Sequence, residues 1–294
     1  MTESGLLVLD KPAGLTSHDV VTRVRRILGT RKVGHAGTLD PMATGVLVVG
    51  VNRATRLLGH LALQDKRYLA TVRLGTTTVS DDADGEVLVV AGPDDLVAVT
   101  DDAVGAAAVT FRGPIEQRPS SVSAIKVDGR RAYDRVRSGE DVELASRSVV
   151  VSRLDVLSIS RRDSMIDVEI DVECSTGTYV RALARDIGAL LGVGGHLTSL
   201  RRTRVGPFDQ PIDLAALEER SASALLPMSA VARDCFVVWD VDEEQARAVR
   251  FGQRIPWLGP KAADAAVAIV GPDGDFIALA SNDDGTARYL AVLA

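Results

Sequence analysis

Short apolar runs alternate with amphipathic stretches along residues 6–191, a pattern that predicts strands interleaved with helices. Runs rich in β-branched residues indicate buried strands, and strict alternation along residues 165–174 indicates a half-buried strand. Apolar positions at helical spacing along residues 19–28, bounded by Thr16-Ser17 and Gly29, predict a capped helix. The expected strands are residues 6–9, 46–51, 66–74, 149–159 and 165–174, with a loop and then a strand at 118–126. The expected helices are residues 19–28, 55–63, 102–109, 133–138 and 179–191.

Two segments depart from this alternation. Residues 31–44 are rich in glycine and contain Pro41, which predicts a loop immediately before a buried strand. After Arg233 the chain consists of short strand-like runs, two of which flank a hairpin signal at residues 271–275. We therefore expect a mixed-sheet α/β or α+β domain at residues 1–233 and a small β-rich domain at residues 234–294.

The composition excludes several classes of protein. A hydrophobic share of 46% and a charged share of 25% are ordinary for a globular protein and argue against a mainly disordered chain. Two widely separated cysteines and four scattered histidines give no spacing typical of a zinc site, and they fit a reducing compartment. The N-terminus has no basic segment followed by a long apolar run, as a signal peptide would have. The sequence also contains no uninterrupted run of about eighteen apolar residues, the length that a membrane helix needs. We expect a soluble, cytoplasmic protein without a membrane segment.

The net charge of −6 argues at first against a nucleic-acid partner, because such proteins present basic surfaces. The acids are concentrated, however: residues 74–111 hold eight acids and no base, and residues 234–294 hold ten acids and five bases. The rest of the chain is net basic. Any one of its basic clusters can be a solvated helix face, but together they favour a polyanionic partner. The clusters are Arg23, Arg25, Arg26, Arg31 and Lys32; Arg130, Arg131, Arg135 and Arg137; Arg161 and Arg162; and Arg201, Arg202 and Arg204.

Asp40 lies in the glycine-rich loop and is the strongest candidate for a reactive group. A loop ahead of a buried strand holds a side chain where substrate can reach it, and Pro41 stiffens the chain there. Taken alone, an Asp-Pro step is more often only a turn in which the carboxylate bonds nearby backbone. Phosphate-loop, dinucleotide-binding and zinc-protease motifs are absent from the sequence, and His35 has no further metal ligand at a suitable spacing.

Five motifs occur in order along residues 6–205, and one of them is sixteen residues long, so chance agreement is negligible. They are residues 10–21 (DKPAGLTSHDVV), 32–47 (KVGHAGTLDPMATGVL), 66–68 (KRY), 175–181 (STGTYVR) and 196–202 (HLTSLRR). With these motifs the chain resembles the TruB family of tRNA pseudouridine synthases. The resemblance implies the pseudouridine synthase fold, a mixed and largely antiparallel sheet flanked by helices, followed by a short, atypical PUA-like RNA-binding domain at residues 234–294.

The resemblance also implies a role for each matched residue. Asp40 is the nucleophile that lets the N1–C1′ bond of uridine break before the base re-bonds through C5. Arg181 pairs with Asp40 and keeps it ionised, and Tyr68 stacks on the uracil and helps to remove the C5 proton. Attack at C1′, addition at C6 and a glycal route all stay open. The remaining substrate contacts are Lys11, His35, Tyr179, Leu200, Arg201 and Arg202, with Lys11 and Pro12 expected to shape the site rather than react.

The implied substrate is uridine-55 in the T-loop of tRNA, flipped out of the folded loop to meet Asp40. Stacking on Tyr68 and contacts between arginines and phosphates would offset the cost of unstacking. The reaction is an isomerisation without redox change, so no cofactor and no metal are expected, and the family expectation is a monomer. The arginines expected to contact the RNA backbone are Arg201, Arg202, Arg204, Arg130 and Arg131. Residues 245–256 resemble the opening of a PUA domain, but the acidity of this region predicts a small contribution to RNA affinity.

Two other functions stay open at this point. A non-catalytic tRNA-binding or tRNA-folding protein could share the scaffold, although binding alone does not require a paired Asp40 and Arg181. An unrelated hydrolase that uses Asp40 would need an acid–base partner, and the sequence offers none. The acidic stretch at residues 81–102 is expected to be a solvated insertion kept away from RNA.

Overall fold

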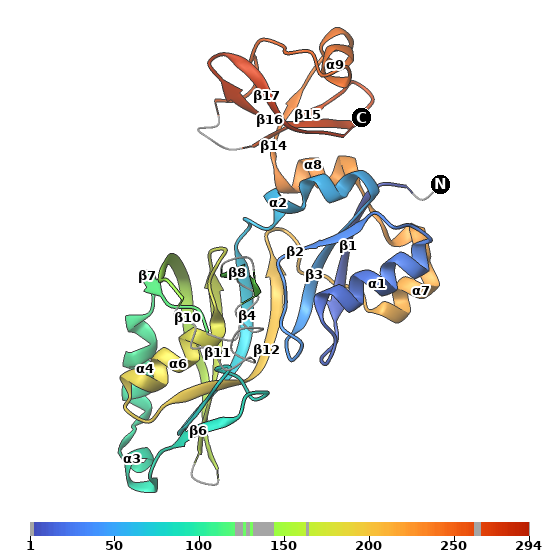
Figure 1. The fold of residues 1–294 in the computed structure, drawn as a ribbon. Helices are drawn as coiled ribbons and strands as arrows, with labels where there is room; N and C mark the ends of the chain where they lie inside the picture. The colour runs from blue at the N-terminus through green and yellow to red at the C-terminus, as the bar shows by residue number, and fades with distance from the viewer. Residues whose placement is uncertain are drawn as a thin grey trace. The chain divides into compact units, whose positions relative to one another are not determined.

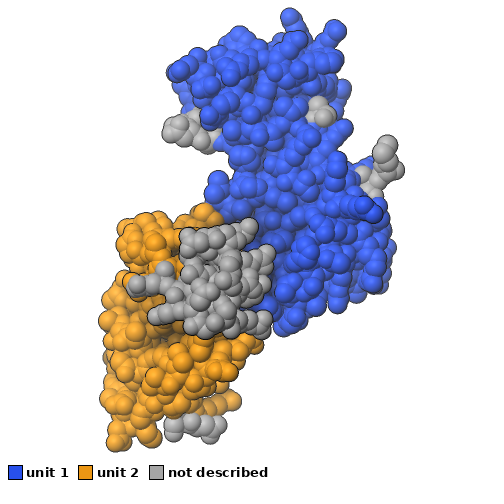
Figure 2. All heavy atoms as spheres, in the orientation of Figure 1, with its two compact units in different colours: residues 1–64, 205–294 blue, residues 65–204 orange. Residues whose placement is uncertain are grey.

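The computed structural model describes residues 3–120, 126–127, 130–131, 144–162, 165–261 and 266–293. The chain forms two compact units (Figure 2). Unit 1 combines residues 1–64 with residues 205–294, and unit 2 consists of residues 65–204. The two ends of the chain therefore belong to the same unit. The expected domain boundary between residues 233 and 234 stays a prediction, because these units divide the chain at other positions.

In unit 1 the strand β1 lies between β13 and β3, and both of these neighbours are antiparallel to it. Figure 1 shows β1 and β3 in this unit. The short strand β2 also pairs with β3 in the antiparallel sense. These strands are β1 (Gly5–Lys11), β2 (Val33–Ala36), β3 (Thr44–Val51) and β13 (Leu226–Pro227). The helices around them are α1 (Ser17–Leu28), η1 (Asn52–Leu57), α2 (Leu58–Leu61), α7 (Leu214–Arg220), η2 (Ser221–Ala224) and α8 (Met228–Cys235).

Helix α1 forms where the sequence predicts it, and its two ends explain why. Thr16 is the N-cap: its side chain accepts a hydrogen bond from the backbone N–H of Asp19, whose carboxylate in turn accepts from the Thr16 backbone. This reciprocal capping box satisfies donors that the first helical turn leaves open. Gly29 ends the helix at a φ of +61°, a left-handed conformation that glycine adopts without steric cost.

The alternation of side chains along β1 and β3 builds two separate cores in unit 1. On one face Leu7, Leu9 and Leu47 belong to a buried cluster with α1 and with Leu217 of α7. On the other face Leu6, Val46 and Val48 belong to a cluster with η1, α2 and α8. Because neighbouring residues of a strand point to opposite faces, a buried strand must be apolar throughout, as the unbroken run along β3 is.

The C-terminal part of unit 1 is a four-stranded sheet in the order β14-β15-β16-β17. Its elements are β14 (Val237–Asp240), α9 (Glu243–Arg250), β15 (Val267–Val270), β16 (Phe276–Asp283) and β17 (Thr286–Val292). The expected hairpin is confirmed, since the backbone N–H of Gly271 donates to the Asp275 carbonyl between β15 and β16. One face packs on α9, whereas Ala268, Val270 and Leu279 belong to the same buried cluster as Leu6 and Val46. The C-terminal sheet therefore shares a core with the N-terminal strands.

Unit 2 is built on strands in the order β12-β4-β11-β10-β7, and the pairs from β4 to β7 are antiparallel. These strands are β4 (Lys66–Leu74), β7 (Gly113–Gln117), β10 (Arg147–Arg162), β11 (Met165–Cys174) and β12 (Gly195–Val205). Two-stranded ladders join β5 (Thr76–Thr78) to β6 (Val87–Val90) and β8 (Lys126–Val127) to β9 (Arg130–Arg131). The helices are α3 (Pro93–Ala98), α4 (Asp101–Thr110) and α6 (Val180–Leu190).

The expected strands at residues 66–74 and 165–174 and the expected helices at residues 102–109 and 179–191 are confirmed, with ends shifted by a few residues or fewer. The expected helix at residues 133–138 lies outside the described residues. The prediction for residues 55–63 was wrong in part, because a 3₁₀ helix, η1, extends to Leu57 and α2 begins only at Leu58. Within the part of the chain that the structure describes, no helix is long and apolar enough to cross a membrane.

Two predictions from the sequence were wrong in ways that matter for the site. Residues 33–36 of the expected loop form the strand β2, which pairs with β3 although glycine and histidine occupy its centre. The acidic stretch is not wholly a solvated insertion: Asp81 and Asp82 are buried, at 8% and 5% exposure. The later acids of this stretch, from Asp84 to Asp102, are exposed as expected.

Candidate active site

The loop that carries Asp40 is fixed to the rest of unit 1 by a buried lysine. Lys11, at the end of β1, has no exposed surface, and its Nζ donates to the carbonyl oxygens of Pro12, Leu15 and Pro41 at 2.7 to 3.1 Å. The Pro41 carbonyl also accepts from the backbone N–H of Gly14 at 2.8 Å. The residue after Asp40 is therefore held by two donors of the residue 11–14 turn. That Lys11 shapes the site rather than reacts stays a prediction.

A second attachment lies on the other side of Asp40. Ser17, the first residue of α1, is 1% exposed, and its Oγ donates to the Leu39 carbonyl at 3.2 Å and accepts from the Leu39 N–H at 2.9 Å. The Ala43 N–H closes the turn on the Asp40 carbonyl at 3.1 Å. Asp40 itself stays half-buried between these anchored neighbours. The backbone on both sides of Asp40 is thus held in place, while Asp40 keeps part of its surface exposed.

His35 lies on β2, directly opposite Val49 of β3, and is half-buried. The same strand pair places Gly34 opposite Gly50, where side chains would crowd Leu58 and the backbone of Ala54. His35 therefore belongs to the sheet edge that leads into the Asp40 loop. Lys11, His35 and Asp40, three of the residues singled out from the sequence, all lie in unit 1.

In unit 2 the side chain of Arg181 is buried, at 4% exposure, in the first turn of α6. Its Nη1 donates to the Ser80 carbonyl at 2.6 Å and lies 3.4 Å from Oδ2 of Asp82. A buried guanidinium is stable only with such partners, because removing its charge from water is costly. The structure therefore excludes the reading of Arg181 as an ordinary surface arginine. An ion pair between Arg181 of unit 2 and Asp40 of unit 1 stays a prediction.

The turn that receives Arg181 is itself tightly bonded. Asp82 Oδ1 accepts from the hydroxyl of Ser80 at 2.5 Å and from the backbone N–H of Asp84 at 3.2 Å, and its carbonyl accepts from Thr78 Oγ1 at 2.7 Å. Sequence reasoning missed Asp82. The available signal was the run of acids in the turn at residues 81–85, which charge counting had grouped with the exposed acids.

Tyr68 is buried, at 8% exposure, on the same face of β4 as Lys66. On β11 these two residues face Val172 and Cys174. Burial, together with the positive charge of Arg202, lowers the pKa of Lys66 to about 8. The face of β4 that carries Tyr68 is therefore apolar, with a readily neutralised lysine next to it.

The three predicted contacts on β12 differ in exposure. Leu200 is 7% exposed and Arg202 is 1% exposed, whereas Arg201 is exposed. This follows from strand alternation, which places Leu200 and Arg202 on one face and Arg201 on the other. Arg201 therefore has open surface, while burial leaves Arg202 little. The backbone contact predicted for Arg202 stays untested.

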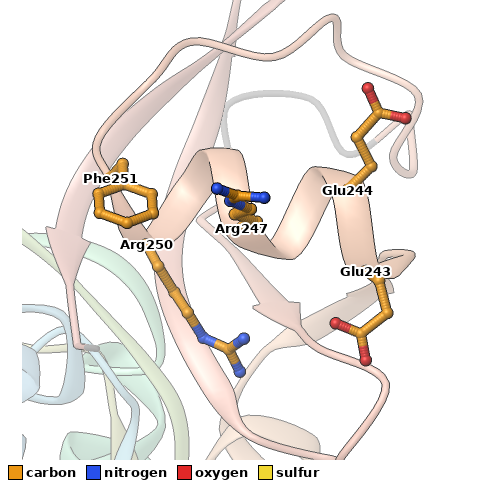
Figure 3. A pocket seen from close by; sticks show the side chains of 5 residues that line it. All are labelled: Glu243, Glu244, Arg247, Arg250 and Phe251. Carbon is orange, nitrogen blue, oxygen red and sulfur yellow. The ribbon is translucent and has the colours of Figure 1, made fainter.

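Two surface pockets of unit 1 are rich in charge. One, of about 920 Å³, lies where α1 ends and η1 begins, and its exposed cations include Arg31, Lys32 and Arg53. The other lies on α9, where Phe251 is 73% exposed (Figure 3). It is lined by Glu243, Glu244, Arg247, Arg250 and Phe251. Among the described residues, no group of three or more histidine, cysteine, aspartate or glutamate side chains is arranged to hold a metal ion.

Family models match nearly the whole chain in consecutive segments. The TruB family pseudouridylate synthase N-terminal domain matches residues 25–180, and the tRNA pseudouridylate synthase B C-terminal domain matches residues 181–229. The C-terminal domain of tRNA pseudouridine synthase II matches residues 236–294. The chain belongs to the TruB family of pseudouridylate synthases. The prediction of an enzyme that makes pseudouridine is thereby confirmed.

Relatives within the TruB family match over nearly their full length. The tRNA pseudouridine synthase B of Cutibacterium acnes is 55% identical over 298 residues, which cover 99% of this chain and 98% of the relative. That of Rhodococcus jostii is 55% identical over 279 residues, which cover 94% of this chain and 89% of the relative. The similarity therefore includes both units and the C-terminal sheet.

Solved structures confirm the expected fold. A crystal structure of a Cbf5-Nop10-Gar1 complex matches with a TM-score of 0.75 and 28% identity, covering 99% of this chain and 85% of that chain. A structure of an H/ACA RNP bound to a substrate RNA containing 2′-deoxyuridine matches with a TM-score of 0.74 and 27% identity, at 99% and 85% coverage. The mixed, largely antiparallel sheet with flanking helices is thus the architecture of pseudouridine synthases.

Proposed function

We propose that this TruB family member converts uridine-55 in the T-loop of tRNA to pseudouridine, and that Asp40 is its nucleophile. The single observation that carries the proposal is the anchored Asp40 loop, in which Lys11 and Ser17 fix the residues on both sides of a half-buried carboxylate. Relatives at 55% identity that bear the name tRNA pseudouridine synthase B support tRNA as the substrate. The enzyme acts as a monomer and needs no metal or cofactor.

The chemistry requires one negative group close to the ribose and base of the target. The N1–C1′ bond breaks with its electrons on the uracil, C5 then bonds to C1′, the C5 proton leaves, and N1 gains a proton. Asp40 stabilises the detached fragments by forming a transient bond to the substrate or by charge, and it is released unchanged. Anchored neighbours matter here because a carboxylate that is already positioned loses little freedom on reaction.

Arg181 is proposed to pair with Asp40 and to hold it ionised and oriented in the assembled site. A planar guanidinium has five donors, so it can bond a second carboxylate while it keeps its contacts with the Ser80 carbonyl and with Asp82. The carboxylate of Asp82 compensates part of the charge of Arg181 and fixes its orientation. Arg181 is thus the proposed link between the buried turn of unit 2 and the nucleophile.

Tyr68 is proposed to stack on the flipped uracil and to help remove the C5 proton, and Tyr179 and Leu200 to contact the same nucleotide. Stacking on an aromatic ring is worth about 1–3 kcal/mol per base and offsets part of the cost of flipping. His35 is proposed to fill the space that the extruded base leaves in the T-loop. These roles rest on the family motifs and on the placement of Tyr68 on an apolar strand face.

Contacts to the RNA backbone are proposed for exposed cations. Arg201 on β12 and the cations Arg31, Lys32 and Arg53 of the large unit 1 pocket have open surface, which a phosphate requires. On the C-terminal domain, Arg247 and the exposed ring of Phe251 line the same surface pocket (Figure 3). We propose that this PUA-like domain contributes a modest share of the RNA affinity.

The proposal is tested with a T-arm hairpin RNA incubated with the purified protein alone, in the presence of EDTA. Mass-spectrometric mapping is expected to find pseudouridine at position 55 only, and a hairpin with cytidine at that position is expected to stay unmodified. Binding without any product would instead support a tRNA-folding protein. Pseudouridine at another position would contradict the proposed site of modification.

A further inference from the structure

Gln117 is a deeply buried polar side chain of unit 2 that the proposed mechanism does not use. It is the last residue of β7, is 1% exposed and pairs with Arg147 of β10. Its side chain does not bond to its own strand. It reaches the segment that enters α6, where Tyr179 and Arg181 lie.

The carboxamide of Gln117 holds the backbone of Tyr179 with two bonds. Its Nε2 donates to the Tyr179 carbonyl at 3.0 Å, and its Oε1 accepts from the Tyr179 N–H at 2.7 Å. The side chain thus matches both groups of one peptide residue, as a paired strand would. A buried amide that makes only one such bond would be left with a costly unsatisfied group, so this double bond fixes one orientation.

The two bonds from Gln117 hold Tyr179 at the start of helix α6. Tyr179 is the N-cap of α6, but its own side chain makes no capping hydrogen bond. The Tyr179 carbonyl also accepts from the Leu183 N–H at 3.2 Å, so Gln117 bonds to the first hydrogen-bonded turn of the helix. Arg181 lies two residues further along that turn. Rotation at Tyr179 would therefore move both the Tyr179 ring and the guanidinium that reaches Asp82.

Neighbouring contacts hold the same two segments together. The Arg118 carbonyl accepts from Nη2 of Arg185 on α6 at 2.8 Å, and Ser120 Oγ donates to Asp81 at 2.5 Å. Arg185 lies 3.1 Å from the same Asp81 carboxylate. Residues 117–120 thus bond to α6 and to the turn that receives Arg181, so the end of β7 does not move independently of the helix.

We propose that Gln117 is a positioning residue of the catalytic site, whose carboxamide sets the conformation of Tyr179 and thereby the placement of Arg181. The inference rests on the proposed function, since it assigns Gln117 to the turnover of the same RNA substrate. Its contribution is to the chemical step and not to RNA affinity, because the buried carboxamide has almost no surface that an RNA could touch.

The test is Gln117→Glu, measured with the T-arm hairpin between pH 6 and pH 9. A carboxylate can still accept from the Tyr179 N–H, but its second oxygen faces the Tyr179 carbonyl and repels it. We expect kcat to fall about tenfold or more at pH 8.5, which is the scale of one lost hydrogen bond, while KM stays within about twofold. Toward pH 6 the ratio of variant to wild-type kcat is expected to rise, because a protonated carboxyl again donates to the carbonyl.

Two further variants separate positioning from other effects. Gln210→Glu makes the same change at an exposed position and is expected to keep the wild-type pH profile. Gln117→Met removes both bonds without adding charge, so its kcat is expected to be reduced by a ratio that does not change with pH. If wild type makes product and Gln117→Met has wild-type kcat, or the Gln117→Glu ratio does not change with pH, the inference fails. Absence of product from wild type would instead contradict the proposed function.

Discussion

Asp82 is a buried charge of unit 2 whose carboxylate has three partners among the described residues. Its carboxylate lies 3.4 Å from Arg181 and accepts from Ser80 and the backbone of Asp84. Removing the partner of a buried charge commonly costs about 3–5 kcal/mol, because the remaining charge is left uncompensated. The orientation of Arg181 therefore depends on a residue that no sequence motif had marked.

Asp82→Asn tests this dependence. The amide keeps the size of the side chain but removes its charge, so Arg181 is expected to lose orientation and kcat on the T-arm hairpin to fall about tenfold or more. The dissociation constant of the hairpin is expected to stay nearly unchanged. The matched control is Asp84→Asn, which removes an exposed acid of the same turn. Equal kcat for the two variants would show that the charge of Asp82 is not needed.

At the scale of elements, helix α1 supports the catalytic loop through a single hydroxyl. Ser17 Oγ makes two bonds to the backbone of Leu39, the residue before Asp40. Ser17→Ala is expected to destabilise unit 1 by about 1–2 kcal/mol, because the buried Leu39 groups lose their partner. It is also expected to lower kcat, because Asp40 becomes less ordered. Thermal melting and hairpin turnover measure the two effects, and His18→Ala on the exposed surface of α1 is the control.

A buried lysine on strand β4 predicts how the stability of the protein depends on pH. The pKa of Lys66 is lowered to about 8, so the folded protein releases this proton more readily than the unfolded chain, whose lysine pKa is 10.5. The stability of wild type relative to Lys66→Met is therefore expected to rise as the pH increases from about 8 to 10.5 and to be constant below 8. Urea unfolding at several pH values measures the difference. A difference that stays constant across this interval would contradict the lowered pKa.

The elements that the sequence predicts best are those whose side-chain pattern reflects burial on one or both faces. Such patterns occur in α1, β4 and β11, and these elements form where expected. Strand β12 was not predicted, because Arg201, Arg202 and Arg204 interrupt the alternation of apolar and polar residues that identifies a strand. Arg202 nevertheless occupies a buried position of this strand. Periodicity records which residues are apolar, and it cannot show that an arginine or an aspartate is buried against a partner distant in sequence.

The residues of the candidate site also fall into two groups, those that a sequence motif identifies and those that only the fold reveals. Asp40, Tyr68 and Arg181 were identified because they lie in contiguous motifs of the family. Asp82 and Gln117 act through contacts that span 99 and 62 positions of the chain respectively, and no local pattern encodes those. The expectation that Lys11 shapes the loop came from its motif, but the three carbonyls that it bonds are known only from the fold.

For the whole molecule, the shared core of unit 1 changes how the C-terminal domain can be tested. Ala268, Val270 and Leu279 are buried in one cluster with Leu6 and Val46, so deletion of residues 234–294 would uncover the face that supports β1 and β3. A loss of RNA binding in such a deletion would not distinguish contact from unfolding. Substitutions on the exposed surface of α9 avoid this difficulty.

The double variant Arg247→Ala and Phe251→Ala removes one cation and one exposed ring from α9 (Figure 3). We expect the dissociation constant for full-length tRNA to increase about two- to tenfold, with a shallower dependence on salt because fewer counterions are released. Binding of the isolated T-arm hairpin is expected to change less. Lys261→Ala, at another exposed cation of the domain, is the control. Unchanged affinity for full-length tRNA would exclude this surface from binding.

The central claim is that the Asp40 carboxylate performs the chemistry while its neighbours hold it in place. The most direct measurement compares wild type with Asp40→Asn in single-turnover reactions on the T-arm hairpin, with binding measured on the same preparations. Since asparagine keeps the size of the side chain and leaves the loop bonds of Lys11 and Ser17 intact, the variant is expected to bind the hairpin within about threefold of wild type and to form no detectable pseudouridine. Pseudouridine formed by Asp40→Asn at a rate near that of wild type would contradict the account.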